Sequence, residues 1–163
     1  MPNWLRPLAT HAATLAVGLG VGTALGIYWL PILTAPTPPA PAALASAEAD
    51  ALYRGRFTRE LEGSDWLHWG EGEVLVGVRS IALRGQLAPG PDYKLYLSPT
   101  FVETEADFLR HKPSMRRVGD VKTFENFMVA VPEGLDVRRF TTVVVWCETF
   151  GQFISAARYR SAE

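Results

Sequence analysis

An uncharged apolar run near the amino terminus constrains this chain more than any other feature. The 22 residues from 12 to 33 (AATLAVGLGVGTALGIYWLPIL) contain no charged side chain. As a helix they would extend about 33 Å at ~1.5 Å per residue, which matches the ~30 Å hydrocarbon core of a bilayer. Trp4 on one flank and Tyr28-Trp29 on the other supply the aromatic residues favoured at membrane interfaces. The run therefore predicts a transmembrane helix over 12–33.

Charge predicts the orientation of this helix. Arg6 is the only Lys or Arg before Glu48, which is the first acidic residue. Positive charge at Arg6 and at the amino terminus predicts that residues 1–11 are cytoplasmic. The helix would then be a signal-anchor of a single-pass plasma (inner) membrane protein, and the rest of the chain would be extracytoplasmic, which in a bacterium means periplasmic.

A cleaved signal peptide is the alternative to an uncleaved anchor. Ala40-Pro41-Ala42 and Ala43-Leu44-Ala45 both fit the small-x-small cleavage pattern. The apolar run is longer than the ~7–15 residues of a signal core, and both sites lie well beyond its end. These two facts favour the anchor, and either alternative predicts export.

Gly18, Gly22 and Gly26 repeat at four-residue spacing and would share one face of the helix. Such a stripe lets a second helix approach closely, so helix–helix association through this face is one interpretation. The other is that glycine is simply more frequent in membrane helices than in soluble ones. The spacing does not separate the two.

A Pro/Ala-rich segment over 34–50 separates the helix from the remaining residues. Its prolines are Pro36, Pro38, Pro39 and Pro41. Closely spaced prolines favour extended polyproline II and oppose a helix, so we expect a semi-rigid spacer between the membrane and a domain over 51–163.

The domain has the pattern of short antiparallel strands. Gly90-Pro91-Asp92 is a turn signal before residues that alternate with a period of two. Thr100 with Glu103 resembles a capping box that opens a short helix to Arg110. The expected strands are 73–78, 80–83, 93–98, 127–131, 141–147 and 153–159. This content predicts a mainly β fold, an antiparallel β-sandwich or barrel with one short helix.

The segment TTVVVWC over 141–147 is apolar at almost every position, which predicts a central strand buried on both faces. Val143, Val145 and Cys147 would share one face. Val144 and Trp146 would share the other.

Charge and motifs exclude several functions. The formal net charge of −1 gives no reason to expect nucleic acid as a partner. The chain has no GxxxxGK[ST], HExxH, GxSxG or CxxC motif. With one cysteine and three histidines it has few ligands for a closed zinc site. A redox accessory or a binding domain fits better than a stand-alone enzyme.

Cys147 is the main candidate site residue. Free cysteine is often simply buried as a small hydrophobe, and a neighbouring carboxylate such as Glu148 disfavours the reactive thiolate. An exported lone thiol, however, risks oxidation unless it is fully buried or used. Both interpretations stay open here.

His68 lies between Trp66 and Trp69, ahead of Gly70-Glu71-Gly72. One interpretation is a surface loop whose tryptophans fold onto the sheet edge. The other is a neutral imidazole that binds copper or haem, with Met128 or Met115 as a soft second ligand. Met128 alternates within an expected strand, so it could instead face the core.

Several ordered motifs resemble the DM-thirteen domain, a small extracellular module described as an electron-transfer domain. They are the early Phe57 and His68-Trp69-Gly70-Glu71-Gly72, then Gly90-Pro91-Asp92 with its alternating strand to Ser98, then Gly119-Asp120, Phe124 and Pro132-Glu133-Gly134-Leu135-Asp136, and finally Val143–Phe150 with Phe153 and Ala156-Ala157. The resemblance covers about residues 53 to 160. The spacing after Gly119-Asp120 is longer than usual, and Arg158-Tyr159-Arg160 replaces a more apolar ending.

The resemblance implies a redox or electron-transfer accessory whose redox residue or metal ligand is Cys147, with Trp146 as its shield or charge relay. It also implies a redox partner in or outside the membrane. It does not name a cofactor, and haem and copper are candidates only through the His68 interpretation above. The competing hypothesis is a non-catalytic binding or scaffolding module. Cys147 would then belong to the core, and the loop around Trp66 and Trp69 would form the partner surface.

Overall fold

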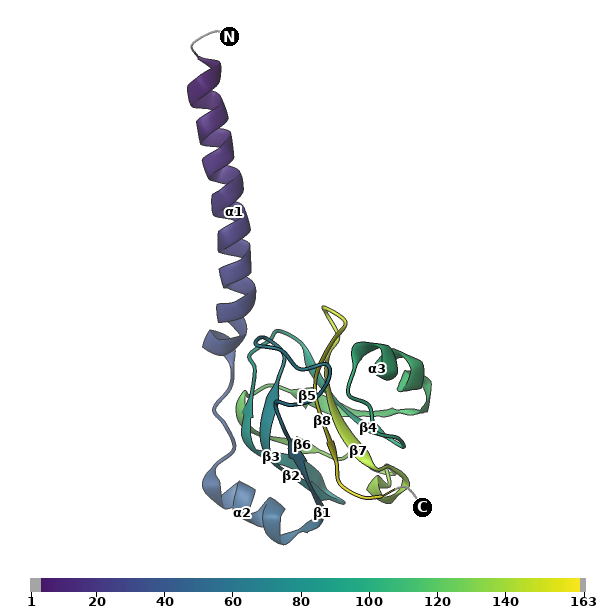
Figure 1. Cartoon of the computed structure of the whole chain (residues 1–163). Helices are drawn as coiled ribbons and strands as arrows, with labels where there is room; N and C mark the ends of the chain where they lie inside the picture. The colour runs from purple at the N-terminus through teal and green to yellow at the C-terminus, as the bar shows by residue number, and fades with distance from the viewer. Residues whose placement is uncertain (1–3, 162–163) are drawn as a thin grey trace.

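The computed structural model describes residues 4–161, in which a 30-residue helix α1 (Leu5–Thr34) projects from a body of β structure (Figure 1). The segment Arg6–Thr34 has a mean hydropathy of 1.7 and is long and apolar enough to cross a membrane, a test that a signal sequence also passes. The expected apolar helix is therefore confirmed. The amino terminus used in the orientation argument and the last residues of the expected domain, 1–3 and 162–163, lie outside the described residues.

The glycine stripe of α1 faces open space in this chain. A Cβ added at Gly18, Gly22 or Gly26 would meet no atom within 4 Å. Nothing in the described part of the chain covers this face, so helix–helix association stays a prediction.

The segment between α1 and the domain differs from the expected spacer. Extended backbone is limited to residues 35–40, and Pro41–Ala49 forms a second helix, α2. Pro41 stands in its first turn, where a missing N–H costs nothing, and alanine is the strongest helix former. Leu44 and Ala47 are buried against Leu75 and Ala82 of the sheet. The expectation of polyproline II over the whole segment was wrong because a helix over Pro41–Ala49 buries Leu44 and Ala47 against the first sheet.

Two antiparallel four-stranded sheets form the domain, as the sequence predicted (Figure 1). The first contains β1 (Ala51–Phe57), β2 (Gly70–Gly77), β3 (Ser80–Leu87) and β6 (Glu125–Ala130), in that order. The second contains β5 (Arg116–Val121), β4 (Tyr93–Ser98), β7 (Thr142–Cys147) and β8 (Gln152–Arg158).

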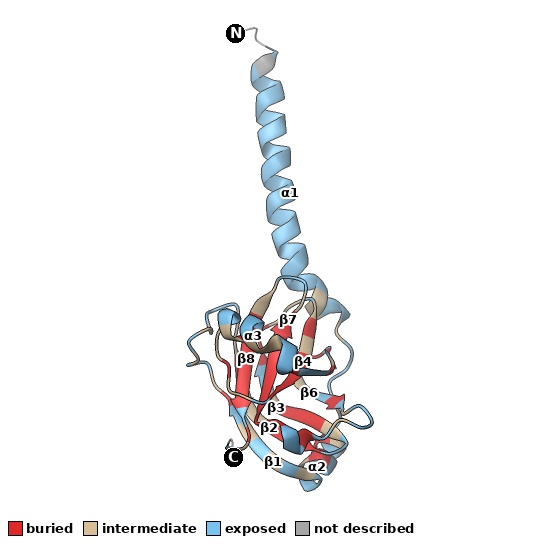
Figure 2. Ribbon diagram, turned by 90° about the vertical axis from the view of Figure 1, so that its right-hand side faces the viewer, coloured by how far each residue is buried: buried red, intermediate tan, exposed pale blue. Residues whose placement is uncertain are grey.

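The core lies mainly between the two sheets, where Figure 2 shows the buried residues concentrated while α1 is exposed along most of its length. Every residue of β7 is buried, and β7 pairs with β4 on one side and β8 on the other. The prediction of a central two-sided strand is confirmed. Val143, Val145 and Cys147 join the core between the sheets, whereas Val144 and Trp146 join a second cluster on the outer face.

The short helix begins later than the sequence indicated. Helix α3 spans Glu105–His111, and its N-cap is Thr104, whose hydroxyl accepts a hydrogen bond from the Asp107 N–H at 3.1 Å. The expected cap, Thr100, is instead hydrogen-bonded through its backbone to Ser98. One-turn 3-10 helices η1 (Lys112–Ser114) and η2 (Val137–Arg139) complete the fold.

Candidate functional site

Cys147 ends β7 at the edge of an apolar cavity. Its thiol is free, and the residue is 2 % exposed. It lies opposite Tyr93 of β4 and Gln152 of β8 in the sheet. The cavity beside it has a volume of about 480 Å³, and we call it the thiol cavity. Its lining comes from α1 (Ala24, Ile27, Tyr28), two loops (Leu67, His68, Pro89, Gly90, Pro91) and the second sheet with its β7–β8 turn (Tyr93, Cys147, Phe150, Gln152, Ile154).

The thiol cavity therefore contains two of the residues singled out from the sequence, Cys147 and His68. They are 79 positions apart in the chain, and the fold alone brings them to one cavity. An imidazole and a thiol at the same apolar surface are both able to bind a soft metal ion or a haem iron.

Asp65 orients His68. The Asp65 carboxylate accepts hydrogen bonds from the backbone N–H groups of Leu67 and His68, both at 2.7 Å, and its other oxygen lies 2.9 Å from Nδ1 of His68. Burial alone would raise the pKa of Asp65, but these hydrogen bonds outweigh it and lower the pKa. An ionised carboxylate here favours the tautomer with the proton on Nδ1, which leaves Nε2 with a free lone pair. Carboxylate support of this kind is usual for metal-binding histidines.

Tyr93 of β4 also lines the same cavity. The residue is 3 % exposed, and its ring packs edge-on against Phe124 with centroids 5.9 Å apart. Its hydroxyl has no hydrogen-bond partner among residues 4–161. Burial raises the pKa of this phenol, so the hydroxyl stays protonated and can donate. The sequence predicted Tyr93 only as the first residue of an alternating strand.

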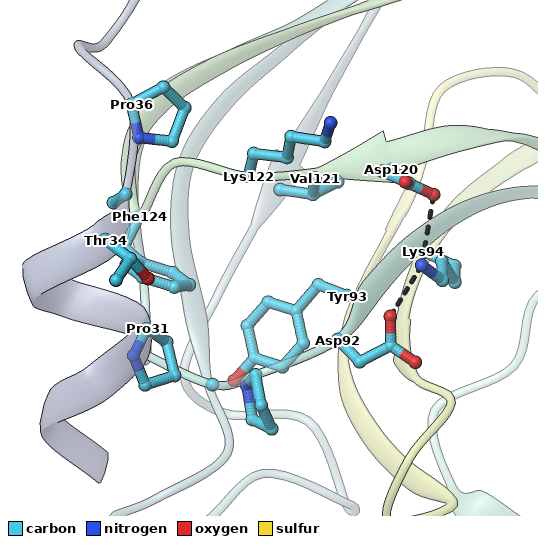
Figure 3. A pocket seen from close by; sticks show the side chains of 13 residues that line it. Pro31, Thr34, Pro36, Asp92, Tyr93, Lys94, Asp120, Val121, Lys122 and Phe124 are labelled. Carbon is cyan, nitrogen blue, oxygen red and sulfur yellow. Dashed lines mark ion pairs between the residues drawn. The ribbon is translucent and has the colours of Figure 1, made fainter. Parts of the chain in front are cut away.

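A second, smaller cavity of about 210 Å³ shares Tyr93 as a lining residue with the thiol cavity (Figure 3). Figure 3 shows the Tyr93 ring pointing toward the end of α1, where Pro31 lies. Lys94 also lines this smaller cavity, and its Nζ forms ion pairs with Asp92 at 2.5 Å and Asp120 at 3.1 Å. Because these charged groups are already paired with one another, they offer little to a ligand. The thiol cavity is therefore the better candidate site.

The Cys147 thiol is not activated in this state. Burial raises its pKa, and although backbone N–H groups oppose this effect, the net shift is upward. The carboxylate that adds to the increase belongs to Asp92. Glu148, which the sequence suggested for this role, instead accepts hydrogen bonds from Tyr96 and Lys112. The thiol is therefore neutral near pH 7, and a bound metal or a partner base would have to remove its proton.

Trp146 lies on the opposite face of β7 from Cys147. It is 1 % exposed and stacks on Phe108 of α3 with centroids 3.9 Å apart and planes 9° from parallel. It does not line the thiol cavity. As an outer layer over β7 it has the position of a shield rather than of a ligand.

The methionines do not complete a metal site. Met128 is 43 % exposed on β6, in the other sheet, so it neither faces the core nor lines the thiol cavity. Met115 is buried in the outer cluster with Trp146. Among the described residues no group of three or more His, Cys, Asp and Glu could hold a metal ion. A three-ligand copper site of the blue-copper type therefore does not fit, whereas His68 would be able to hold a haem iron.

A polar cluster covers the outer face near Trp146. The Tyr96 hydroxyl donates to Glu148, and Lys112 Nζ lies 3.0–3.1 Å from both oxygens of the same carboxylate. Burial alone would raise the pKa of Glu148, but Tyr96 and Lys112 outweigh it and lower the pKa below its ordinary 4.5.

This cluster predicts acid sensitivity. Because the folded-state pKa of Glu148 is lowered, its contribution to stability is complete above about pH 4.5 and is lost as the pH falls through the folded-state value. Glu148→Gln should cost about 1 kcal/mol at pH 7 and flatten the fall in stability below pH 4.5. Urea unfolding across pH 3–7 measures both effects. Glu133→Gln, in an exposed loop, is the control, and equal acid profiles for the two variants would contradict the prediction.

The fold and the cavity define a class of protein: a small antiparallel sandwich module that follows a long apolar helix and holds a buried thiol beside an oriented imidazole. The family model described as Electron transfer DM13 matches residues 61–159. The chain therefore belongs to this electron-transfer family, as its motifs indicated. Comparisons with curated proteins and with solved structures gave no significant match.

Proposed function

We propose that this protein is a membrane-anchored, extracytoplasmic redox accessory in which Cys147 is the redox residue or the ligand of a redox centre. Membership of an electron-transfer family supports a redox-related role. The observation that carries the assignment to Cys147 is that its thiol lines one apolar cavity together with His68, which Asp65 orients.

Each residue has a defined part in this proposal. Burial raises the pKa of the Cys147 thiol and so keeps it protonated, and a metal or haem that bound there would have to displace the proton. The free Nε2 of His68 is the second ligand or the base that takes the thiol proton. Trp146 and Phe108 cover the other face of β7 and protect the strand from that side.

A non-catalytic binding module is the second candidate. Trp66 is 83 % exposed and therefore does not fold onto the sheet, while Trp69, three residues later, packs under the Arg59 guanidinium at 3.4 Å. Tryptophan is enriched among the residues that contribute most to protein–protein binding, so an exposed one is a candidate partner contact. The burial and raised pKa of Cys147 are equally consistent with a core residue.

A cofactor titration separates the two functions. The purified full chain in detergent should develop a Soret band on addition of haem, or a copper charge-transfer band on addition of copper. His68→Ala should abolish the band, and His111→Ala, which removes a histidine from α3 outside the cavity, should leave it unchanged. A featureless visible spectrum under all conditions, together with a thiol that reacts only after unfolding, would reject the redox proposal in favour of the binding module.

The topology is tested separately. Arg6 before the apolar helix predicts a cytoplasmic amino terminus, so alkaline phosphatase fused after Glu163 should be active. β-Galactosidase at the same position is the control and should be inactive. A stable but inactive phosphatase fusion would refute the orientation, and a mature chain that starts near Ser46 would refute the uncleaved anchor.

A further inference from the structure

The thiol cavity has one wall made by the apolar helix itself. Ala24, Ile27 and Tyr28 of α1 line it, and all three belong to the segment predicted to span the bilayer. If α1 is in the membrane, the cavity lies at the outer bilayer surface and not on the water-facing side of the domain. A molecule dissolved in the bilayer could then reach Cys147 without crossing water.

The loop tips at this end of the domain are apolar as well. Leu67 is 37 % exposed and Phe150 50 % exposed, and both line the thiol cavity. Trp66, next to Leu67 in the chain, is 83 % exposed. Figure 1 shows the β7–β8 turn, which carries Phe150, reaching toward the level of the last turns of α1. Tryptophan and large apolar side chains at such a level favour the headgroup region of the membrane.

Two polar atoms interrupt the apolar lining, and both lack a partner in residues 4–161. The Tyr93 hydroxyl is a donor with no hydrogen-bond partner among those residues, although the residue as a whole is 3 % exposed, so it is available to a ligand. In the tautomer whose Nδ1–H donates to Asp65, Nε2 of His68 is an acceptor. A ligand that satisfies both must be apolar in its body and must carry a group that accepts from Tyr93 and a group that donates to His68.

We propose that the thiol cavity binds the ring of a bilayer-soluble quinol. A quinol has a flat apolar ring with hydroxyl groups that both donate and accept hydrogen bonds, and its apolar substituents remain in the bilayer beside α1. A volume of about 480 Å³ is in the usual range for small-molecule sites. A lipid acyl chain would fill the same space but would leave Tyr93 and His68 without partners. The proposal rests on the proposed function and names the ligand of the same site.

Binding is tested with the full chain in lipid nanodiscs under anaerobic conditions, with duroquinol as the probe and lipid-only nanodiscs as the blank. Calorimetry should show saturable binding of duroquinol. Durene, the same methylated ring without hydroxyl groups, should bind about 10-fold more weakly or worse. Equal affinities for the two rings would show that the cavity accepts any apolar molecule and would overturn the proposal.

Two variants assign the polar contacts. Tyr93→Phe and His68→Leu should each weaken duroquinol binding by about 3- to 10-fold, the effect of one lost hydrogen bond. Tyr159→Phe is the matched control, since that buried hydroxyl donates to the Val137 carbonyl at 2.7 Å and lies outside the cavity. Unchanged affinity in both Tyr93→Phe and His68→Leu overturns the proposal. If either variant fails to fold, as a melt of the free protein would show, the other decides.

The two proposals can fail independently. Calorimetry reports duroquinol binding without any redox change, whereas the cofactor titration reports a chromophore at Cys147. Duroquinol binding without a chromophore or a reactive thiol would reject only the redox role. A chromophore without duroquinol binding would reject only the quinol site.

Discussion

Cys147→Ala is expected to abolish any chromophore or electron-transfer activity while lowering the free energy of unfolding by only about 1–2 kcal/mol. The substitution removes one sulfur atom from a residue that already borders a cavity, so little new void is created. Thermal melts give the stability, and visible spectra with thiol titration give the site. Cys147→Ser should cost about 1–3 kcal/mol, because it places a hydroxyl among apolar side chains.

Val145→Ala is the matched control for this prediction. Val145 lies two residues earlier on the same face of β7, is fully buried and does not line the thiol cavity. Its truncation should cost about 2–3 kcal/mol and leave the folded fraction with full activity. If Cys147→Ala instead lost activity only in proportion to lost folding, as Val145→Ala should, Cys147 would be a core residue and the binding module would be the better function.

Phe108→Ala is expected to cause a large loss of stability, about 3–5 kcal/mol. Phe108 is fully buried, stacks on Trp146 at 3.9 Å and meets the Tyr96 ring edge-on at 5.2 Å. Its truncation leaves a void between α3 and the second sheet and removes two aromatic contacts. Urea unfolding of the full chain in detergent, followed by tryptophan fluorescence, measures the change.

Leu109→Ala is the control, because the neighbouring Leu109 is 52 % exposed and its truncation should change stability by no more than about 0.5 kcal/mol. Similar losses in the two variants would mean that the aromatic stack does not hold α3 on the sheet. Phe108 and Trp146 would then not form a stable cover over the outer face of β7.

Local sequence patterns were sufficient to predict an element wherever its apolar residues follow the period of a strand or form a continuous run. The period of two in β4 put Tyr93, Leu95 and Leu97 on one face, which in the structure belongs to the core between the sheets, and the apolar run of β7 predicted its central position. These patterns failed where contacts between residues far apart in the sequence determine the secondary structure. Strand β5 (RRVGDV) is polar, and its pairing with β4 rather than its composition makes it a strand. Helix α2 forms where prolines suggested extended chain because Leu44 and Ala47 pack on the first sheet.

The candidate site could be predicted only in part. Cys147 and His68 were identifiable as residue types able to carry redox chemistry, but nothing in their spacing shows that they line one cavity. The role of Asp65 had a local signal in the Asp-x-x-His spacing, since a carboxylate three residues before an imidazole can cap the same turn. The unpartnered Tyr93 hydroxyl had none, because a missing partner is a property of the surroundings and not of the residue.

By itself, then, the sequence determined the apolar helix, the sandwich of antiparallel strands, the two faces of β7 and the family. All of these depend on periodicity and composition over neighbouring residues, which act through local geometry. Only the tertiary structure decided that the thiol, the imidazole and the phenol share a cavity and that α1 forms its wall. The residues that line this cavity are as far apart in the chain as Ala24 and Ile154, and the cavity exists only after the two sheets pack and the chain brings α1 to one end of the sandwich.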